Sequence, residues 1–555
     1  MKRYSLLVAV VFVVSLFAFA GTAFAYKVLD LTQKVENGMP AWAGKWNGMT
    51  MWAGGKTQMQ DYDLVGGFYG HDLAFGEHTG THMDSPAHFT VGMWRLDQIP
   101  QDKFVGKCIV MDMRPWVKDQ DGYEVSLADV KEWEQKTGCN LAKDAAGSMV
   151  FMWMGWDKYW DEYLAGKNER FIGKSFPGIG QDAAQYIADC RIKGFGMDVI
   201  SIDIYDKVMS GNTPAHNSVL GNNMWIIENI RFDPSVADKW VYAVTAPMKI
   251  YQGSGAPCRI FVLDDTKAKG TAASLASMKQ LEFRFMTSTM HDLANYLENG
   301  MHVWQSVLGA CLMNSTVGFG GIGSVGNTAD LRGIYPMWNY KDQGFYSQQL
   351  FINEHTGTHT DSPSHRKEGA RWTIDKVALN HWVAPCLIVN ASHYGPEQGD
   401  WIFDMAMFND WMSKHPGLTI NKGDMVCFSQ DMVHKWALHN HGFHQDWVTT
   451  KFPGIGGDVA KYLVQKGVVG ALTDVTSIDA AMSAIYGKGN DVTNNPTHIT
   501  LLGTGSFVTE NVGGDLQQAV DSKGMMFNMV CMNTKNGSGG HCRLWYFEGL
   551  DIPIE

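Results

Sequence analysis

The sequence predicts an α/β protein built from two tandem copies of one domain. Three observations support this prediction. Several short motifs occur twice in the same order, the 555 residues are enough for two or three domains, and strand-like segments alternate with helix-like ones. A hydrophobic content of 45% with 18% charged residues is typical of a globular chain.

The repeated motifs indicate a duplication. EHTGTHMDSPAH at 77–88 returns as EHTGTHTDSPSH at 354–365, an offset of about 277 residues. Three further pairs keep the same order: ENGM at 36–39 and 298–301, FPGIG at 176–180 and 452–456, and DVISID at 198–203 with DVTSID at 474–479. An offset that drifts slowly is expected of a duplicated domain with small loop insertions.

Each copy combines two kinds of secondary structure. Apolar and β-branched runs predict strands at Cys108–Met113, Met149–Met154, Val199–Ile204 and Arg259–Leu263. Residues 182–193 and 458–466 predict helices, because each has an acidic start, apolar residues spaced by three to four, and a basic end before glycine. Strands alternating with helices predict an α/β domain.

The first 25 residues have the features of a signal peptide. Two basic residues precede the apolar run Leu6–Ala20, and Ala23-Phe24-Ala25 fits a small-x-small cleavage site. We therefore expect a periplasmic or secreted protein that is cleaved before Tyr26. No comparable apolar run follows, so no membrane association is expected after cleavage.

The rest of the chain divides near its middle. The first domain is predicted at 26–266 and the second at 281–555, joined by a linker at 267–280 that is rich in small and polar residues. Half of the 530 residues that follow the signal peptide is about 265, which is within the usual range for one domain.

Composition excludes several classes of partner and site. The net charge of −12 argues against nucleic-acid binding, because such proteins carry basic surfaces that neutralise phosphate. Nine cysteines are too few for a disulfide scaffold, and no C-x-x-C pair suggests a thiolate zinc site. Buried free thiols are the favoured interpretation of Cys108, Cys258, Cys386 and Cys542, although disulfide formation stays open.

The first motif predicts metal ligands. In an extended backbone alternate residues share a face, so His78, His82 and Asp84 can converge on one point. Gly80 lies on that face and would leave room for an ion, and the chain then carries His88 past the site. Two imidazoles and a carboxylate are the ligands of an open catalytic Zn²⁺, Mn²⁺ or Fe²⁺ site.

The same set returns in the second copy. Its members are His355, His359, Asp361 and His365. A second pair, His216 and Glu228, recurs as His498 and Glu510 with the same spacing of twelve. We expect a hairpin or a strand–turn–strand unit to bring each pair to its first cluster, where a bridging carboxylate could hold two ions.

The H-x-G-T-H-x-D-x-P-x-H motif, followed by a distant histidine and a glutamate, resembles the cyclase family of metal hydrolases, which includes bacterial kynurenine formamidases and isatin hydrolases. The resemblance extends over both copies. It implies a swivelling β/β/α-type domain, here with the two copies arranged as an intramolecular pseudodimer; further homo-oligomerisation stays open. It also implies one or two divalent ions per domain, Zn²⁺ or Mn²⁺.

The resemblance assigns a role to each candidate residue. His78, His82 and Asp84 would bind one ion, and Asp84, His216 and Glu228 a second, with the matching residues serving copy two. His88 and His365 would transfer protons. Trp42 and Trp304 match a tryptophan near the substrate, although packing or contact between the copies is an equal interpretation.

The implied reaction is hydrolysis of an aromatic amide. A metal-activated water would attack the carbonyl, and a histidine would deliver a proton to the departing nitrogen. The substrate is expected to be an aryl formamide or a cyclic amide. The alternatives are an isatin-type or lactone hydrolase or cyclase of the same family, and a non-catalytic periplasmic protein that binds a metal or a ligand.

Two other features carry less weight. Gly321–Gly326 fits G-x-G-x-x-G but lacks a strand before it and a helix after it, so a loop is the better interpretation. The histidines at 434, 439, 441 and 444 have no counterparts in the first copy and are interpreted as solvated loop residues.

Overall fold

The computed structural model describes residues 25–36, 39–40, 69–70, 72–297, 333–338, 345–366, 372–396, 399–432, 452–480 and 495–555. Residues 1–24 of the expected signal peptide lie outside these ranges. Among the helices within them, none is both long enough and apolar enough to cross a membrane.

The described residues of the first copy form twelve strands and eight α-helices, the last of which leads into the second copy. The strands are β1 (Lys27–Asp30), β2 (Lys34–Val35), β3 (Asp72–Gly76), β4 (His82–Asp84), β5 (Val105–Asp112), β6 (Glu124–Val125), β7 (Met149–Trp153), β8 (Gly178–Ile179), β9 (Gly194–Met197), β10 (Trp225–Glu228), β11 (Lys239–Pro247) and β12 (Gly255–Asp264). The α-helices are α1 (Arg114–Val117), α2 (Leu127–Thr137), α3 (Leu141–Asp144), α4 (Lys158–Leu164), α5 (Gln181–Asp189), α6 (Tyr205–Met209), α7 (Pro214–Leu220) and α8 (Gly270–Met286).

The second copy repeats this arrangement. Its described strands are β13 (Thr289–Asp292), β14 (Gly333–Trp338), β15 (Ser347–Asn353), β16 (His359–Asp361), β17 (Val383–Asn390), β18 (Ile402–Phe403), β19 (Met425–Ser429), β20 (Gly454–Ile455), β21 (Gly470–Thr473), β22 (Phe507–Glu510), β23 (Ser522–Val530), β24 (Asn533–Thr534) and β25 (Gly539–Glu548). Its described α-helices are α10 (Leu379–Trp382), α11 (Met405–Lys414), α13 (Gly457–Lys466) and α15 (Pro496–Gly503). The short 3₁₀ helices η1 (Pro86–His88) and η6 (Pro363–His365) follow the metal-ligand motifs.

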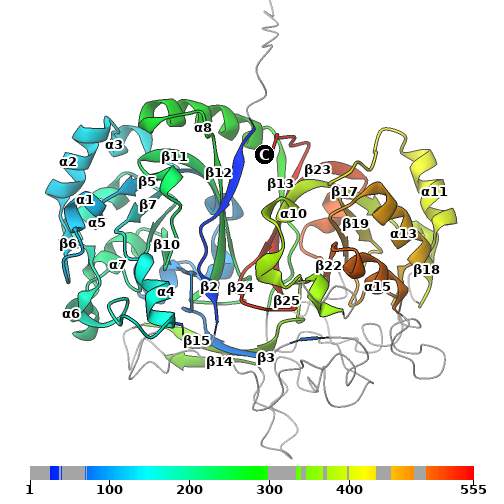
Figure 1. The fold of residues 1–555 in the computed structure, drawn as a ribbon, viewed down its shortest axis with the longest axis horizontal. Coiled ribbons are helices and arrows are strands. Elements are labelled where there is room, and N and C mark those ends of the chain that lie inside the picture. The colour runs from blue at the N-terminus through cyan, green and yellow to red at the C-terminus, as the bar shows by residue number, and fades with distance from the viewer. Residues whose placement is uncertain are drawn as a thin grey trace, which may run out of the picture.

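Each copy forms a closed barrel. In copy one the sheet order is β1-β12-β11-β5-β7-β9-β10-β4, and β4 pairs again with β12, so that seven strands close a ring. Copy two has the matching order, and its ring closes where β23 pairs with β25. Figure 1 shows the two barrels side by side, with α8 above the first. The predicted duplicated α/β fold is confirmed.

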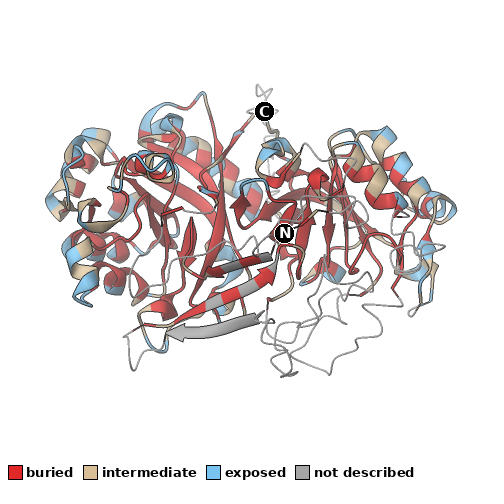
Figure 2. Ribbon diagram, turned by 60° about the horizontal axis from the view of Figure 1, so that its bottom comes forward, coloured by how far each residue is buried: buried red, intermediate tan, exposed pale blue. Residues whose placement is uncertain are grey.

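The parallel strands form the core of each barrel. β5, β7, β9 and β10 run parallel, as do β17, β19, β21 and β22. Every residue of Met149–Trp153 is buried, which is typical of a parallel strand covered on both faces. Figure 2 shows the buried strands at the centre and the exposed residues on the outer helices.

The two copies share backbone pairing and a buried interface. β3 of copy one pairs antiparallel with β15 of copy two, and β2 pairs with β24. Trp545 stacks on Phe104 at 5.7 Å, and its indole N–H donates to the Thr245 carbonyl at 3.0 Å. These contacts join the copies into one intramolecular pseudodimer.

One predicted strand lies elsewhere in the structure, and most of the segment predicted to link the two copies is helical. Val199–Ile204 is irregular, and the strand lies earlier, at Gly194–Met197. The apolar residues of this segment are buried in a loop and do not pair with a neighbouring strand. The predicted linker at 267–280 overlaps helix α8. The Ser274 hydroxyl of this helix accepts the backbone N–H of Trp240 at 2.9 Å.

Candidate metal centres

Each candidate site is assembled around the shortest strand of its ring. β4 pairs antiparallel with β10, which places His82 opposite Glu228, and β16 pairs with β22 in the same register. We call the cluster in copy one site one: His78, His82, Asp84, His88, His216 and Glu228. Site two consists of His355, His359, Asp361, His365, His498 and Glu510.

The ligand atoms of site one lie close together. His78 Nδ1 is 2.6 Å from Asp84 Oδ1, and His82 Nε2 is 3.3 Å from the same oxygen. His82 Nε2 is also 3.4 Å from Glu228 Oε2. His216 Nε2 lies 3.2 Å from Glu228 Oε1 and 3.7 Å from Asp84 Oδ2. The ligand atoms fall into two groups, each within 4.8 Å, that share Asp84.

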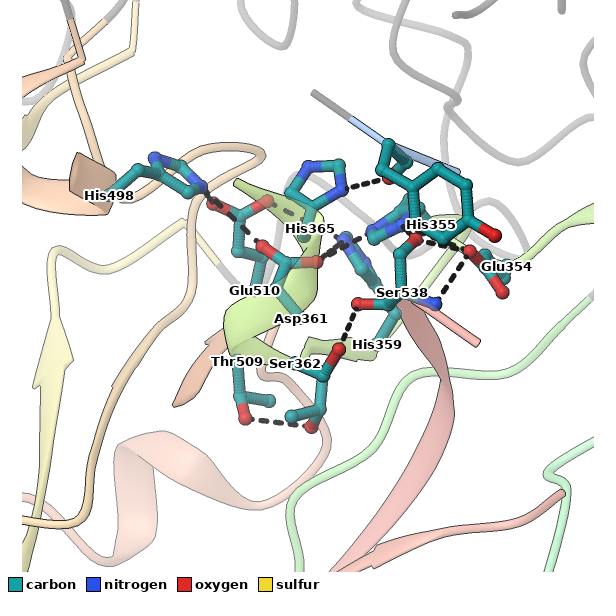
Figure 3. A network of polar contacts seen from close by, with 12 residues as sticks. Glu354, His355, His359, Asp361, Ser362, His365, His498, Thr509, Glu510 and Ser538 are labelled. Atoms are coloured by element: carbon teal, nitrogen blue, oxygen red, sulfur yellow. Dashed lines mark hydrogen bonds and ion pairs between the residues drawn. The ribbon is translucent and has the colours of Figure 1, made fainter. Parts of the chain in front are cut away.

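Site two, which Figure 3 shows, has nearly the same distances as site one. His355 Nδ1 is 2.6 Å and His359 Nε2 3.3 Å from Asp361 Oδ1. His498 Nε2 is 3.4 Å from Asp361 Oδ2 and 3.2 Å from Glu510 Oε1. The structure therefore brings together both sets of ligands that the sequence predicts.

The far ring nitrogens of the histidines are held by acceptors. His82 Nδ1 donates to the Gly80 carbonyl at 3.0 Å, and His216 Nδ1 donates to Asp203 at 2.7 Å. These bonds hold a proton on Nδ1 and direct Nε2 at the site, where a bound metal ion would take the Nε2 lone pair. His359 and His498 make the matching bonds to Gly357 and Asp479, at 2.9 and 2.7 Å.

His78 is oriented by a buried serine and glutamate. The Ser254 hydroxyl donates to Glu77 at 2.6 Å and lies 2.9 Å from His78 Nε2. With Nε2–H directed at Ser254, Nδ1 presents a lone pair to the ionised Asp84 oxygen. Two lone pairs at 2.6 Å repel unless a proton or a metal ion accompanies them.

Sequence reasoning missed these supporting residues. Asp203 and Asp479 close the repeated D-V-x-S-I-D motif, and Glu77 and Glu354 open the repeated E-H-T-G-T-H motif. Ser254 and Ser538 lie in the repeated G-S-G segments. Their recurrence was the available signal, but nothing in one chain showed that these residues contact the histidines.

The electrostatics of the site favour a divalent cation. Although burial opposes ionisation, the His78 and His88 rings hold the pKa of Asp84 well below its usual range. Burial likewise favours neutral His216, but hydrogen bonds to Asp203 and Glu228 raise its pKa to about 10. A proton held this tightly marks a position of concentrated negative charge, and a bound metal ion would replace that proton.

Each of the two predicted proton-transfer histidines lies against the ring of a candidate metal ligand. The His88 ring lies 3.8 Å from His78 at an interplanar angle of 22°, and His365 lies 3.9 Å from His355. Burial, and then the positive field of His78, holds the pKa of His88 well below 6.5. His365 is also within 4.8 Å of His355 and Asp361, so the geometry allows it to bind the ion.

The local structure differs from the predicted extended segment. The strand begins only at His82, and Gly80 adopts a left-handed φ of +63° in the bend before it. The prediction that Gly80 makes room for an ion is therefore wrong. The glycine that gives space is Gly255, where a Cβ would lie 2.5 Å from His78 Cε1.

The second ligand pair also comes from elements other than those predicted. His216 lies on helix α7, and Glu228 ends strand β10. The unit is helix–turn–strand rather than a hairpin, because Pro214 begins a helix and Gly221 ends it.

Aromatic side chains from both copies border site one. The Phe89 ring is 4.3 Å from His88 and 4.7 Å from His216. Phe345 of copy two lies 5.5 Å from His88 and 5.7 Å from Phe89. This edge of the site can therefore contact a flat, apolar group.

Several predicted features cannot be placed. Trp42 and Trp304, the loop at 321–326 and the histidines between 434 and 444 lie outside the described residues. The described cysteines are all buried free thiols, which confirms the favoured interpretation for Cys108, Cys258, Cys386 and Cys542.

Each of these two α/β barrels gathers imidazole and carboxylate groups that could hold a metal ion, with candidate ligand atoms within 4.8 Å of one another. The donors are borderline nitrogen and hard oxygen, which suits Zn²⁺ and Mn²⁺ alike. The Cyclase family model matches residues 29–204 and 291–480, one segment in each copy. The chain belongs to this family.

Similar proteins in this family are hydrolases. An isatin hydrolase from Roseibium aggregatum is 27% identical over 37% of this chain and 79% of its own length. A kynurenine formamidase from Erythrobacter litoralis is 25% identical over 42% of this chain and 92% of its own. Isatin hydrolase A from Ralstonia solanacearum, a solved structure, has 18% identity and a TM-score of 0.40, covering 52% of this chain and all of that one (100%).

Proposed function

We propose that each copy is a metal-dependent amide hydrolase that acts on carbon–nitrogen bonds other than peptide bonds. The observation that carries this proposal is the duplicated cluster, in which His88 or His365, with its pKa lowered by burial, lies against one histidine of a group that could hold a metal ion. A divalent ion bound there would polarise a carbonyl and lower the pKa of a water ligand towards 7. The chain's own residues must then position the substrate and move the protons.

His88 has the properties of a proton carrier in site one. Its Nδ1 is committed to a backbone carbonyl, so the lone pair is on Nε2. Because burial and His78 keep the ring neutral, Nε2 can accept the proton of the attacking water. The resulting imidazolium can return that proton to the departing nitrogen, which would otherwise leave as a strongly basic anion. His365 is placed to do the same in site two.

An aryl formamide or a cyclic aryl amide is the proposed substrate class. The rings of Phe89 and Phe345 beside His88 support an aromatic group next to the reacting carbonyl. The named relatives, isatin hydrolase and kynurenine formamidase, support the same choice. A lactone hydrolase is the alternative that a substrate panel would separate.

The test is the double variant His88→Ala with His365→Ala. We expect metal content, measured by elemental analysis, to stay at the wild-type value while kcat on formanilide and isatin falls by about 10²–10⁴-fold. His393→Ala, which removes an exposed histidine that belongs to neither site, is the control. Wild-type rates in the double variant would remove the assigned role, and no turnover in the wild type would favour a metal-binding protein without catalysis.

We also propose that the protein is exported, on the strength of the basic, apolar and small-residue pattern of residues 1–25. Amino-terminal sequencing of the mature protein should start at Tyr26. A mature chain that retains Met1 in the cytoplasmic fraction would contradict export.

A further inference from the structure

Each proton-transfer histidine is bonded to the main chain of the opposite copy. His88 Nδ1 donates to the Tyr346 carbonyl at 2.7 Å, and the Tyr346 N–H donates back to the His88 carbonyl at 3.0 Å. In site two, His365 Nδ1 donates to the Tyr69 carbonyl at 2.7 Å, and the Tyr69 N–H donates to the His365 carbonyl at 2.9 Å. The two exchanges are reciprocal.

The exchange is anchored by a strand pair between the copies. Tyr69 precedes β3 and Tyr346 precedes β15, and these strands pair antiparallel with Ala74 opposite Phe351. Ala74 and Phe351 occupy equivalent positions in the two copies, because 351 − 74 = 277 is the offset of the motif repeat. The two strands are therefore related by a local two-fold axis, and a residue before each strand lies at the site of the opposite copy.

The bond fixes two properties of each histidine. A carbonyl can only accept, so the proton must lie on Nδ1 and the lone pair on Nε2. The bond also fixes the orientation of the His88 or His365 ring, which lies against His78 or His355.

We propose that Tyr346 and Tyr69 are positioning residues that act through their carbonyls on the proton-transfer histidine of the opposite copy, so that neither site is complete without both halves. This inference rests on the proposed function. It predicts a crossed phenotype, in which a backbone change in copy two impairs site one.

The experiment uses the full chain with one site disabled. Asp361→Asn leaves turnover to site one, and Asp84→Asn leaves it to site two. Tyr346→Pro, which removes the N–H and displaces the carbonyl, should lower kcat at least tenfold in the Asp361→Asn background and change the pH profile of kcat/KM. In the Asp84→Asn background it should change kcat less than twofold. Tyr346→Phe, which keeps the backbone, is the matched control.

Two further measurements keep the proposal testable if the proline variant folds poorly or turnover is absent. Tyr346→Gly loosens the same segment without removing the N–H and should give a smaller loss with the same crossed pattern. Long-range ¹H–¹⁵N spectra of histidine-labelled protein report the tautomer without turnover, and only the His88 signals should shift in either variant. An equal loss of kcat at both sites in the Tyr346→Pro or Tyr346→Gly variant, or a loss of kcat confined to site two, would overturn the proposal. Inactive single-site parents with a shifted His88 signal would instead reject the proposed function.

Discussion

Replacing Asp203 by asparagine tests how the second ligand group is held. The carboxylate accepts the His216 Nδ1–H at 2.7 Å and also the backbone N–H groups of Ala215 and His216, each at 3.0 Å. An asparagine amide can still accept from the backbone. Where its NH₂ faces Nδ1, however, it selects the tautomer with the proton on Nε2, which removes the lone pair that would bind the metal.

The expected loss follows from the role of such carboxylates. Removing a hydrogen-bond partner of a metal-bound histidine typically weakens metal binding by about 10–100-fold, which corresponds to about 1.4–2.7 kcal/mol. Asp203 and His216 are both almost fully buried, so solvent cannot replace the lost bond and the upper half of this range is expected. Asp479→Asn should have the same effect at site two.

Metal affinity, measured by competition with a chelator, is the assay. Asp198→Asn is a matched control, because Asp198 lies in the same motif and is equally buried but accepts the N–H groups of Met154 and Trp156 instead of a histidine. It should lower Tm and leave the metal Kd unchanged. A folded Asp203→Asn variant with wild-type affinity at every site, or an equal loss in Asp198→Asn, would refute the reasoning.

Three further outcomes are expected. Gly255→Ala places a Cβ 2.5 Å from His78 Cε1, so the variant should lose metal at site one, whereas Gly417→Ala, with no atom within 4 Å of the added Cβ, should bind normally; equal metal content in both would contradict this. Burial lowers the pKa of His541 to about 3, so its contribution to stability is present above the unfolded pKa near 6.5 and is lost as the pH falls. The free energy of unfolding, measured by denaturant titration, should fall between pH 6.5 and 5 by about 2 kcal/mol less in His541→Leu than in the wild type. The same fall in both proteins would contradict this role of His541. Asp292→Ala leaves Arg543 and Lys249 buried without their carboxylate, 2.8 and 3.0 Å away, and should lower the free energy of unfolding by about 3–5 kcal/mol; a change below about 1 kcal/mol would show that the pair is dispensable.

The sequence by itself determined the duplication and the α/β class, and it selected the candidate metal ligands that the fold brings together. Repeats are visible without structure, because the same residues recur in order, and imidazole and carboxylate groups at motif spacing have few other uses. Helices 182–193 and 458–466 were predictable from local periodicity, and they correspond to α5 and α13. The strand predicted at Val199–Ile204 was wrong because a buried loop can be as apolar as a strand.

Only the tertiary structure decided how the sites are completed. The pairing of β4 with β10 brings His82 opposite Glu228, which lies 146 positions later in the chain, and no local pattern encodes that register. The carbonyls of Tyr69 and Tyr346 carry no side-chain signal at all, since every residue has one. Their importance arises from the antiparallel pairing of β3 with β15, which places the backbone of each copy against the histidine of the other.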